Sequence, residues 1–289
     1  MHIPVLQKEL IDYLNPEPDE NFIDCTAGFL GHAMLLLEKN GPKGKMLAIE
    51  RDPVIFKSLL KSKTERLVLV NDSFVNLEKI VEENKLKKVS GILFDLGLSS
   101  WHLKESERGF SFQRNETLDM RYNPADSLTA EKILNYWSLP EIEKNLKEYG
   151  EERFAGKIAG KIIEERKKGQ IKSTSQLVRI IKEAVPQKYQ HQRIHFATRT
   201  FQALRIAVND ELKNLEIALP QAADILTPGG KMAVISFHSL EDRIVKNFFK
   251  QQDSQKWEIL TKKPVVPTKK EIKINPRSRS AKMRVIKKI

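Results

Sequence analysis

Two carboxylates stand where short apolar segments of the chain end. Glu50 closes the segment 45–50, and Asp95 closes the segment 91–95. In a doubly wound sheet, ligands bind at the carboxyl edge, where an acid at the end of a strand accepts hydrogen bonds from ribose hydroxyl groups. The spacing of these residues therefore predicts a site for a ribose-bearing cofactor.

The turn before this pair contains glycine, and its pattern helps to choose among cofactors. Gly28 and Gly31 follow the apolar segment 21–27, and a helical pattern begins directly after them. A dinucleotide-binding turn requires a third glycine, and a phosphate-binding loop requires Gly-Lys-Ser or Gly-Lys-Thr. The chain has neither pattern. This argues against NAD and ATP and favours S-adenosylmethionine.

Three side chains are candidates for holding the adenosine of this cofactor. Glu50 would accept the ribose hydroxyl groups, Phe74 would form a wall against the adenine, and Asp95 would supply a nearby polar group. Glu50 has an alternative role as a surface acid, and Phe74 has one as a core residue. Asp95, at a strand end and followed by Gly97, is harder to explain by structure alone.

The segment Asp95-Leu-Gly-Leu-Ser-Ser-Trp101 combines an acid, hydroxyl groups and an aromatic ring. This combination is typical of a site for a flat base that bears an amine. The lone pair of an exocyclic amine is delocalised into the ring, so catalysis of its methylation depends mainly on positioning and electrostatics. We predict Asp95 as the catalytic residue, with Ser99 and Trp101 contacting a base that is splayed out and stacked.

An alternation of strands and helices must position these residues, and it is interrupted once. The alternation runs to about residue 100, gives way to helical patterns, and then resumes. The simplest account is a single α/β fold with a doubly wound sheet and an inserted helical domain. We expect its first part at 1–107, a helical insert for substrate recognition at 108–200, and its second part, with a basic C-terminal segment, at 201–289.

The second part contains further expected elements. Apolar residues recur every three or four positions from Phe201 to Leu226, which predicts a helix, and Pro220 is expected to break it and to start a second helix. Ser239-Leu-Glu-Asp242 resembles a capping box at the start of another helix. Three apolar runs predict strands, at 231–237, 257–260 and 283–289.

The net charge of +12 is concentrated in two regions. Residues 262–289 carry eleven basic residues and one acidic residue, a net of +10, whereas residues 108–200 carry eighteen and twelve, a net of +6. The remainder therefore carries −4. Concentrated positive charge predicts a polyanionic partner, although a basic terminus can also be a solvated tail.

Cysteine content and hydropathy limit the class of protein. The single cysteine, Cys25, excludes a disulfide framework and a cysteine metal cluster. His191 and His195 have no acidic partner in a metal-ligand pattern, so we expect no metal. The sequence has no visible secretory signal and no apolar stretch of membrane-spanning length. We expect a cytoplasmic protein without a membrane partner.

Several strings of residues, in this order, give the chain a specific resemblance. They are Asp95-Leu-Gly-Leu-Ser-Ser100, Arg108-Gly-Phe-Ser-Phe112, Leu118-Asp-Met-Arg121, Tyr149-Gly-Glu-Glu-Arg-Phe-Ala155, Ala197-Thr-Arg-Thr-Phe-Gln-Ala-Leu-Arg-Ile206, Ser236-Phe-His-Ser-Leu-Glu-Asp-Arg243 and Asn275-Pro-Arg-Ser-Arg-Ser280. With them, the chain resembles the bacterial small-subunit ribosomal RNA (cytosine-N4) methyltransferases, known as RsmH or MraW. The resemblance covers nearly the whole chain, from His2-Ile-Pro-Val5 to the C-terminus.

The resemblance implies a class I methyltransferase fold with a helical insert. It implies transfer of a methyl group from S-adenosylmethionine to N4 of a cytosine in the decoding centre of 16S rRNA, within the small ribosomal subunit. It leaves the oligomeric state open, a homodimer included. By position, the cofactor-binding residues of the family fall on Leu30, Gly31, His32, Glu50, Phe74, Asp95 and His102.

Three of these residues depart from the usual pattern of the family. Leu30 stands where a second glycine is usual, which is tolerable if the contact is made by backbone N–H groups. Glu50 replaces the more common aspartate and reaches one methylene further, so ribose contact is expected to survive. His102 stands where glutamine is frequent.

Other motifs have both a structural and a functional interpretation. Phe110 and Arg121 either pack the insert onto the site loop or touch RNA. Arg199 and Arg205 either contact the substrate or form salt bridges with acids such as Asp210, and we assign Arg199 to the substrate. His238 follows a strand at the same sheet edge as Asp95, and we place it on the substrate side; without a Gly-x-Ser-x-Gly motif, no serine hydrolase is expected.

Three functions remain open from the sequence. The first is the RNA cytosine-N4 methyltransferase, which the intact Asp95 loop favours. The second is a ribosome-assembly factor that binds cofactor and RNA without turnover. The third is a methyltransferase for DNA or a small molecule, of which the concentrated basic charge disfavours only the small molecule.

Overall fold

A computed structural model describes residues 4–289, which form two compact units. Unit 1 contains the described residues up to Gly97 together with Leu212–Ile289, and unit 2 contains Leu98–Glu211. Unit 2 begins before and ends after the range 108–200 expected for the insert. His2 and Ile3, from the first motif of the family resemblance, lie outside the described residues.

Unit 1 is built on a seven-stranded sheet with the order β3-β2-β1-β4-β5-β7-β6. The five strands from β3 to β5 in this order are parallel to one another, and β7 runs antiparallel to both β5 and β6. The strands are β1 (Asn21–Asp24), β2 (Met46–Ile49), β3 (Leu67–Val70), β4 (Val89–Asp95), β5 (Leu226–Ser236), β6 (Trp257–Ile259) and β7 (Lys282–Lys288). The predicted doubly wound sheet is thus confirmed. Its parallel strands are short apolar runs in the sequence, as expected for strands that a sheet buries.

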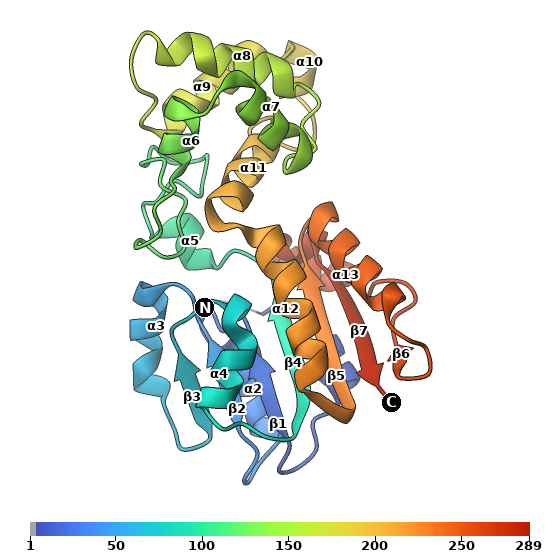
Figure 1. Cartoon of the computed structure of the whole chain (residues 1–289). Helices are drawn as coiled ribbons and strands as arrows, with labels where there is room; N and C mark the ends of the chain where they lie inside the picture. Colours follow the sequence, from blue (N-terminus) through green and yellow to red (C-terminus); the bar gives the residue numbers. More distant parts are fainter. Residues whose placement is uncertain (1–3) are drawn as a thin grey trace. The chain divides into compact units, whose positions relative to one another are not determined.

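Helices join the strands of unit 1 and cover the sheet. They are α1 (Gln7–Leu14), α2 (Gly31–Lys39), α3 (Pro53–Leu59), α4 (Leu77–Glu83), α12 (Glu211–Ile225), α13 (Ser239–Gln251) and α14 (Lys269–Ile274), with short 3-10 turns at Leu60–Ser62, Phe74–Asn76 and Pro276–Ser280. Figure 1 shows α4 and α12 lying over the strands of unit 1. Apolar residues of α4, α12 and α13 pack into one core with alternate residues of the central strands. No helix within residues 4–289 combines the length and apolarity needed to cross a membrane.

The helical run after the insert breaks at a different residue from the one expected. Pro220 lies inside α12, and the break between α11 (Thr198–Asn209) and α12 falls at Asp210. Asp210 adopts a left-handed backbone with φ +52°, and its N–H donates to the carbonyl of Ile206; aspartate tolerates this conformation better than most residues. Pro220 removes one helical hydrogen bond, but buried residues on both sides of it hold α12 on the core. The prediction of a break at Pro220 is therefore wrong.

Unit 2 is helical and has its own core. Besides α11, its helices are α5 (Ser100–Lys104), α6 (Ala130–Tyr136), α7 (Leu139–Glu148), α8 (Ala155–Arg166), α9 (Thr174–Ala184) and α10 (Gln187–Gln190). Ser138 and Ser173 form capping boxes with Glu141 and Gln176 and fix the starts of α7 and α9. The apolar faces of these helices meet in a single buried cluster, which confirms the helical character predicted for this region.

Candidate cofactor and substrate site

The strand order of unit 1 reverses between β1 and β4, and the predicted site lies at this point. β1 leads outward to β2 and β3, while β4 leads the other way to β5. Ligands of doubly wound sheets bind outside the carboxyl ends of the strands at such a switch point. Asp24 ends β1 and Asp95 ends β4, and the two strands are paired up to Asp24 and Leu93. Both acids are therefore at the expected ligand-binding edge.

The loop after β1 adopts an unusual backbone conformation. Gly28 has φ +49° and Leu30 has φ +63°, which is a left-handed conformation that costs a leucine roughly 1–2 kcal/mol. The Leu30 side chain is buried and its N–H donates to the carbonyl of Ala27 at 2.7 Å, so its backbone contact with a cofactor stays a prediction. A Cβ at Gly31 would collide with the ring of Pro4, so this glycine also has a purely structural role.

The carboxylate of Glu50 ties this loop to the end of β2. Its Oε2 accepts a hydrogen bond from the N–H of Gly28 at 2.9 Å, and its Oε1 accepts one from the N–H of Asp52 at 2.7 Å. Burial raises the pKa of Glu50 to about 8, against the opposing effect of these hydrogen bonds. Glu50 is therefore not a surface acid, and it is held where the sequence pattern places a ribose-binding group.

His32 and Asp95 place polar atoms in the interior of unit 1 without satisfying them. The His32 side chain is only 4% exposed, and its Nε2 lies 3.6 Å from Asp95 Oδ2. Among the described residues, neither ring nitrogen of His32 nor Oδ1 of Asp95 has a hydrogen-bond partner. Unsatisfied buried polar atoms are costly, and three of them in one place make this cluster a candidate contact for a polar ligand.

Asp24 and Thr26 belong to the same cluster, although the sequence reasoning missed both. Asp24 is 1% exposed, and its Oδ1 accepts hydrogen bonds from the N–H and the hydroxyl of Thr26. Burial raises the pKa of Asp24 to about 6, and the nearby Asp95 adds to this effect. Asp24 is an acid at the end of an apolar run, as Glu50 and Asp95 are. The sequence pattern that predicts those two acids as site residues therefore also points to Asp24.

Phe74 has one ring contact in the core of unit 1. Its ring meets Phe94 edge to face, with 5.6 Å between the centroids. It begins a 3-10 turn in which the N–H of Val75 donates to the hydroxyl of Ser73, and its side chain is only partly buried. Both interpretations of Phe74, as core residue and as adenine wall, are compatible with this position, and the second stays a prediction.

His238 caps a helix of unit 1. It is the N-cap of α13, where its Nδ1 accepts from the N–H of Glu241 at 3.4 Å and the Glu241 carboxylate accepts from the N–H of His238 at 3.3 Å. The capping box predicted from Ser239 therefore begins one residue earlier. The substrate role of His238 stays a prediction.

Four residues predicted for the site lie in unit 2, three of them around α5. Ser99 caps α5, and its hydroxyl lies 2.9 Å from Nδ1 of His102. His102 is 5% exposed and packs edge to face against the rings of Trp101, Phe110 and Tyr122. This geometry gives His102 a packing role within unit 2, and its assignment to the cofactor stays a prediction.

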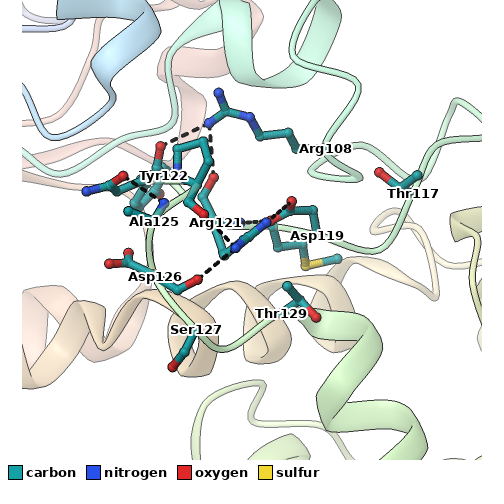
Figure 2. Close-up of polar contacts among 12 residues, drawn as sticks. Arg108, Thr117, Asp119, Arg121, Tyr122, Ala125, Asp126, Ser127 and Thr129 are labelled. Atoms are coloured by element: carbon teal, nitrogen blue, oxygen red, sulfur yellow. Dashed lines mark hydrogen bonds and ion pairs between the residues drawn. The ribbon is translucent and has the colours of Figure 1, made fainter.

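Two motif arginines in unit 2 are bound by the protein itself (Figure 2). Arg121 forms a bidentate pair with Asp119 at 2.7 and 2.8 Å, and donates to the carbonyls of Pro124 and Asp126. Burial favours a raised pKa for Asp119, but the hydrogen bonds and charge of Arg121 outweigh it and hold this pKa below its usual value.

The neighbouring residues of these motifs are similarly engaged. Arg108 donates to the carbonyls of Arg121 and Tyr122, and its guanidinium lies over the ring of Trp101, 5.3 Å from the centroid. Phe110 is 5% exposed and stacks on Tyr122. Of the two interpretations left open for Phe110 and Arg121, the structure supports packing within the insert.

The two arginines of α11 have different partners. Arg205 pairs with Glu211 at 2.9 Å through a fork of hydrogen bonds. Arg199 donates to the carbonyl of Glu151 at 2.7 Å. The salt-bridge alternative is thus realised for Arg205, with Glu211 as the acid. The substrate role of Arg199 stays a prediction.

The basic C-terminal segment divides into buried and exposed charges. Arg284 pairs with Asp242 at 2.7 Å, and Lys288 donates to the carbonyls of Ala223 and Leu226. The exposed charges are Lys262, Lys263, Lys269, Lys270, Lys273, Arg277 and Arg279. This second group presents its charge to solvent, and Lys282 and Lys287 are half-exposed.

The residues at the carboxyl edge of unit 1 fit S-adenosylmethionine. Glu50 is placed at the end of β2 for a ribose, and the backbone after β1 takes the left-handed form seen at Gly28 and Leu30. The unpartnered atoms of His32 and Asp95 would be available for polar contacts with the remainder of the cofactor. The donor set contains oxygen and nitrogen groups suited to hydroxyl and amine partners.

Comparison with known proteins agrees with this site. The model of the MraW methylase family matches residues 1–289. Relatives named "Ribosomal RNA small subunit methyltransferase H" include those of Sulfurihydrogenibium sp. (46% identity, covering 100% of this chain and 99% of the relative), Heliobacterium mobile (44%; 100% and 99%) and Clostridium botulinum (43%; 100% and 99%). The class I methyltransferase fold and the family resemblance inferred from the sequence are confirmed, and the chain belongs to the MraW methylase family.

Proposed function

We propose that this protein transfers the methyl group of S-adenosylmethionine to N4 of a cytosine in the decoding centre of 16S rRNA, within the small ribosomal subunit. The observation that carries the proposal is the group of unpartnered atoms on His32 and Asp95 at the switch point of the sheet. Membership of the family supports the methyl-transfer chemistry, and the names of the relatives support small-subunit rRNA as the substrate.

The residues of unit 1 would hold the cofactor and orient the amine. When bound, the cofactor supplies an electrophilic methyl group on a positively charged sulfur. Glu50 would accept hydrogen bonds from the ribose, and Phe74 would flank the adenine. The Asp95 carboxylate would accept an N–H of the target amine, which lowers the cost of developing positive charge on the nitrogen. The protein contributes positioning and electrostatics, and no covalent intermediate is needed.

The basic surface residues would bring the RNA to this site. Phosphate contacts position a nucleic acid without reading its sequence. The exposed basic side chains between Lys262 and Arg279 are suited to such contacts. Ser99, Trp101 and Arg199 in unit 2 and His238 in unit 1 would then contact the target nucleotide. Because the substrate is ribosomal RNA, we expect the protein to act in the cytoplasm.

Methyl transfer to different acceptors tests the proposal. Labelled S-adenosylmethionine would be incubated with the protein and with small ribosomal subunits that lack the modification, naked 16S rRNA, or DNA. We expect stoichiometric label in the RNA of the subunits and none in DNA. Cofactor binding without transfer to any RNA would instead favour an assembly factor, and transfer to DNA would overturn the choice of substrate.

A further inference from the structure

Thr26 stands where strands β1 and β4 separate. Up to that point the main chains are joined directly, with the N–H of Cys25 donating to the carbonyl of Leu93 at 2.9 Å. Two residues later, the N–H of Asp95 donates to the hydroxyl oxygen of Thr26 at 2.7 Å. A side-chain oxygen therefore continues the ladder after the backbone of β1 has turned away from β4.

Asp24 fixes the direction of this hydroxyl. Oδ1 of Asp24 accepts from the N–H of Thr26 at 3.0 Å and from its hydroxyl at 3.3 Å. A hydroxyl has one hydrogen and two lone pairs, so donation to Asp24 leaves a lone pair for the N–H of Asp95. Asp24 is 1% exposed, and low exposure to water strengthens such a chain of hydrogen bonds.

On its other side, β4 is held by β5. Asp95 is in register with Ile235, and the N–H of Leu96 donates to the Ile235 carbonyl at 3.0 Å. The main chain at Asp95 is thus held from both neighbouring strands, by Thr26 on one side and by Ile235 on the other. The Asp95 carboxylate, 3.6 Å from His32, depends on this anchored main chain for its position.

We propose that Thr26, oriented by Asp24, is a positioning residue for Asp95. Thr26 acts through the backbone N–H of Asp95 and needs no contact with cofactor or RNA. The effect on catalysis rests on the proposed function, because Asp95 must orient an amine. The effect on the backbone of Asp95 does not rest on it, since the hydrogen bond is a feature of the protein alone.

The test compares two threonines that bond to opposite ends of the same strand. Thr26→Val removes the acceptor for the N–H of Asp95, whereas Thr227→Val removes the hydroxyl that donates to the carbonyl of Val89 at 3.0 Å. Thr26→Ser restores the hydroxyl. Thr26→Cys, whose thiol is a weak acceptor, serves as a second variant where Thr26→Val does not fold.

We expect Thr26→Val to lower kcat on small subunits roughly tenfold or more, because small displacements of a reacting group cost up to about 10²-fold. KM for the subunits should stay unchanged, and amide hydrogen exchange at Asp95 should accelerate in the cofactor-free protein. Thr26→Ser should restore both properties, and Thr227→Val should change neither. The decrease in kcat should therefore occur in the same variants as the faster amide hydrogen exchange at Asp95.

Two results have different meanings. If the wild-type protein methylates subunits, and Thr26→Val matches Thr227→Val in kcat and in exchange at Asp95, the positioning role is overturned. If the wild-type protein transfers no methyl group, the proposed function fails, while the exchange rates at Asp95 still decide whether Thr26 anchors this backbone.

Discussion

The two units of this protein treat their buried and half-buried charged groups in opposite ways. In unit 1, His32 and Asp95 leave interior polar atoms without partners, and Glu50 is buried enough for its pKa to rise to about 8. In unit 2, the guanidinium of Arg121 is matched by Asp119 and by two carbonyl oxygens, and Arg108 by two more. Unit 1 thus leaves atoms of ionisable side chains unsatisfied, whereas unit 2 matches its motif arginines internally and leaves buried atoms of two uncharged side chains, Asn145 and Thr200, without partners among the described residues.

This difference separates residues that bind from residues that fold. Sequences that specify a structure tend to satisfy every local rule except at functional sites. The unsatisfied ionisable groups of unit 1, which lie at the switch point of the sheet, are therefore our candidates for ligand contacts, whereas the satisfied arginines of unit 2 have structural roles. An arginine in a motif of a nucleic-acid enzyme is not by itself a contact to RNA.

The largest effect is expected at Asp95. Asp95→Ala should lower methyl transfer by at least about 10²-fold, because an oriented polar group at the reacting amine is lost. It should not lower the melting temperature appreciably, since Oδ1 of Asp95 has no partner to lose among the described residues and Oδ2 has only the 3.6 Å approach to Nε2 of His32. Single-turnover transfer and thermal unfolding would be measured together. Near-normal turnover would remove Asp95 from the mechanism.

Arg121 should behave in the opposite manner. Arg121→Gln removes the pair with Asp119 and the hydrogen bonds to Pro124 and Asp126, so we expect a loss of about 3 kcal/mol in the free energy of unfolding. Under conditions in which the variant is folded, its affinity for RNA should stay unchanged. Arg179→Gln, at an exposed arginine of the same unit, is the control and should have little effect. Weaker RNA binding without loss of stability would contradict the structural role.

Glu50 should give unit 1 a measurable dependence of stability on pH. Because burial raises its pKa from 4.5 to about 8, the folded protein favours the protonated form. Its contribution to stability is present below pH 4.5 and is lost as the pH rises towards 8. Glu50→Gln should remove this decline, which is on the order of a few kcal/mol.

The measurement is denaturant unfolding of the cofactor-free protein between pH 5 and about 8.5. The slope against pH is compared, so a uniform change in stability does not affect the result. Glu82→Gln, at an exposed acid of the same unit, controls for the change in charge. Equal slopes in the wild-type protein and in Glu50→Gln would contradict the buried, destabilised state of this carboxylate.

The smallest effect is expected from the exposed basic surface. Neutralising Lys269, Lys270, Arg277 and Arg279 should weaken RNA binding and reduce the slope of log affinity against log salt by up to about 0.7 per lost phosphate contact. A control variant neutralises four exposed lysines elsewhere in unit 1, at Lys57, Lys61, Lys63 and Lys85. If both variants bind RNA with the wild-type slope, the C-terminal segment is only solvated surface.

Much of the fold was predictable because apolar runs and acids at their ends report directly on buried strands. The predicted ends of β2 and β4 at Glu50 and Asp95 differ by at most one residue from the structure. Pro220 was misjudged because propensity is local, whereas the buried face of α12 compensates for the missing hydrogen bond. Asp24 was overlooked although it carries the same strand-end signal as the other two acids.

The rest of the site depends on contacts that a sequence does not contain. Nothing in the order of residues shows that Thr26 bonds to Asp95, 69 positions away, or that Gly31 is needed to accommodate Pro4. Exposed arginines and arginines that are bound within the protein also look alike in sequence, because the partners of the bound ones are mostly backbone carbonyls. Only the folded structure separates Arg284, paired with Asp242, from Arg279 on the surface.

The central claim is the identity of the methylated atom. Small subunits that lack the modification would be treated with the protein and S-adenosylmethionine, and their 16S rRNA digested and analysed by mass spectrometry of nucleosides and of mapped fragments. We predict N4-methylcytidine at a single position in the decoding centre. A methyl group on another nucleoside, or on cytosines spread over the RNA, would contradict the account.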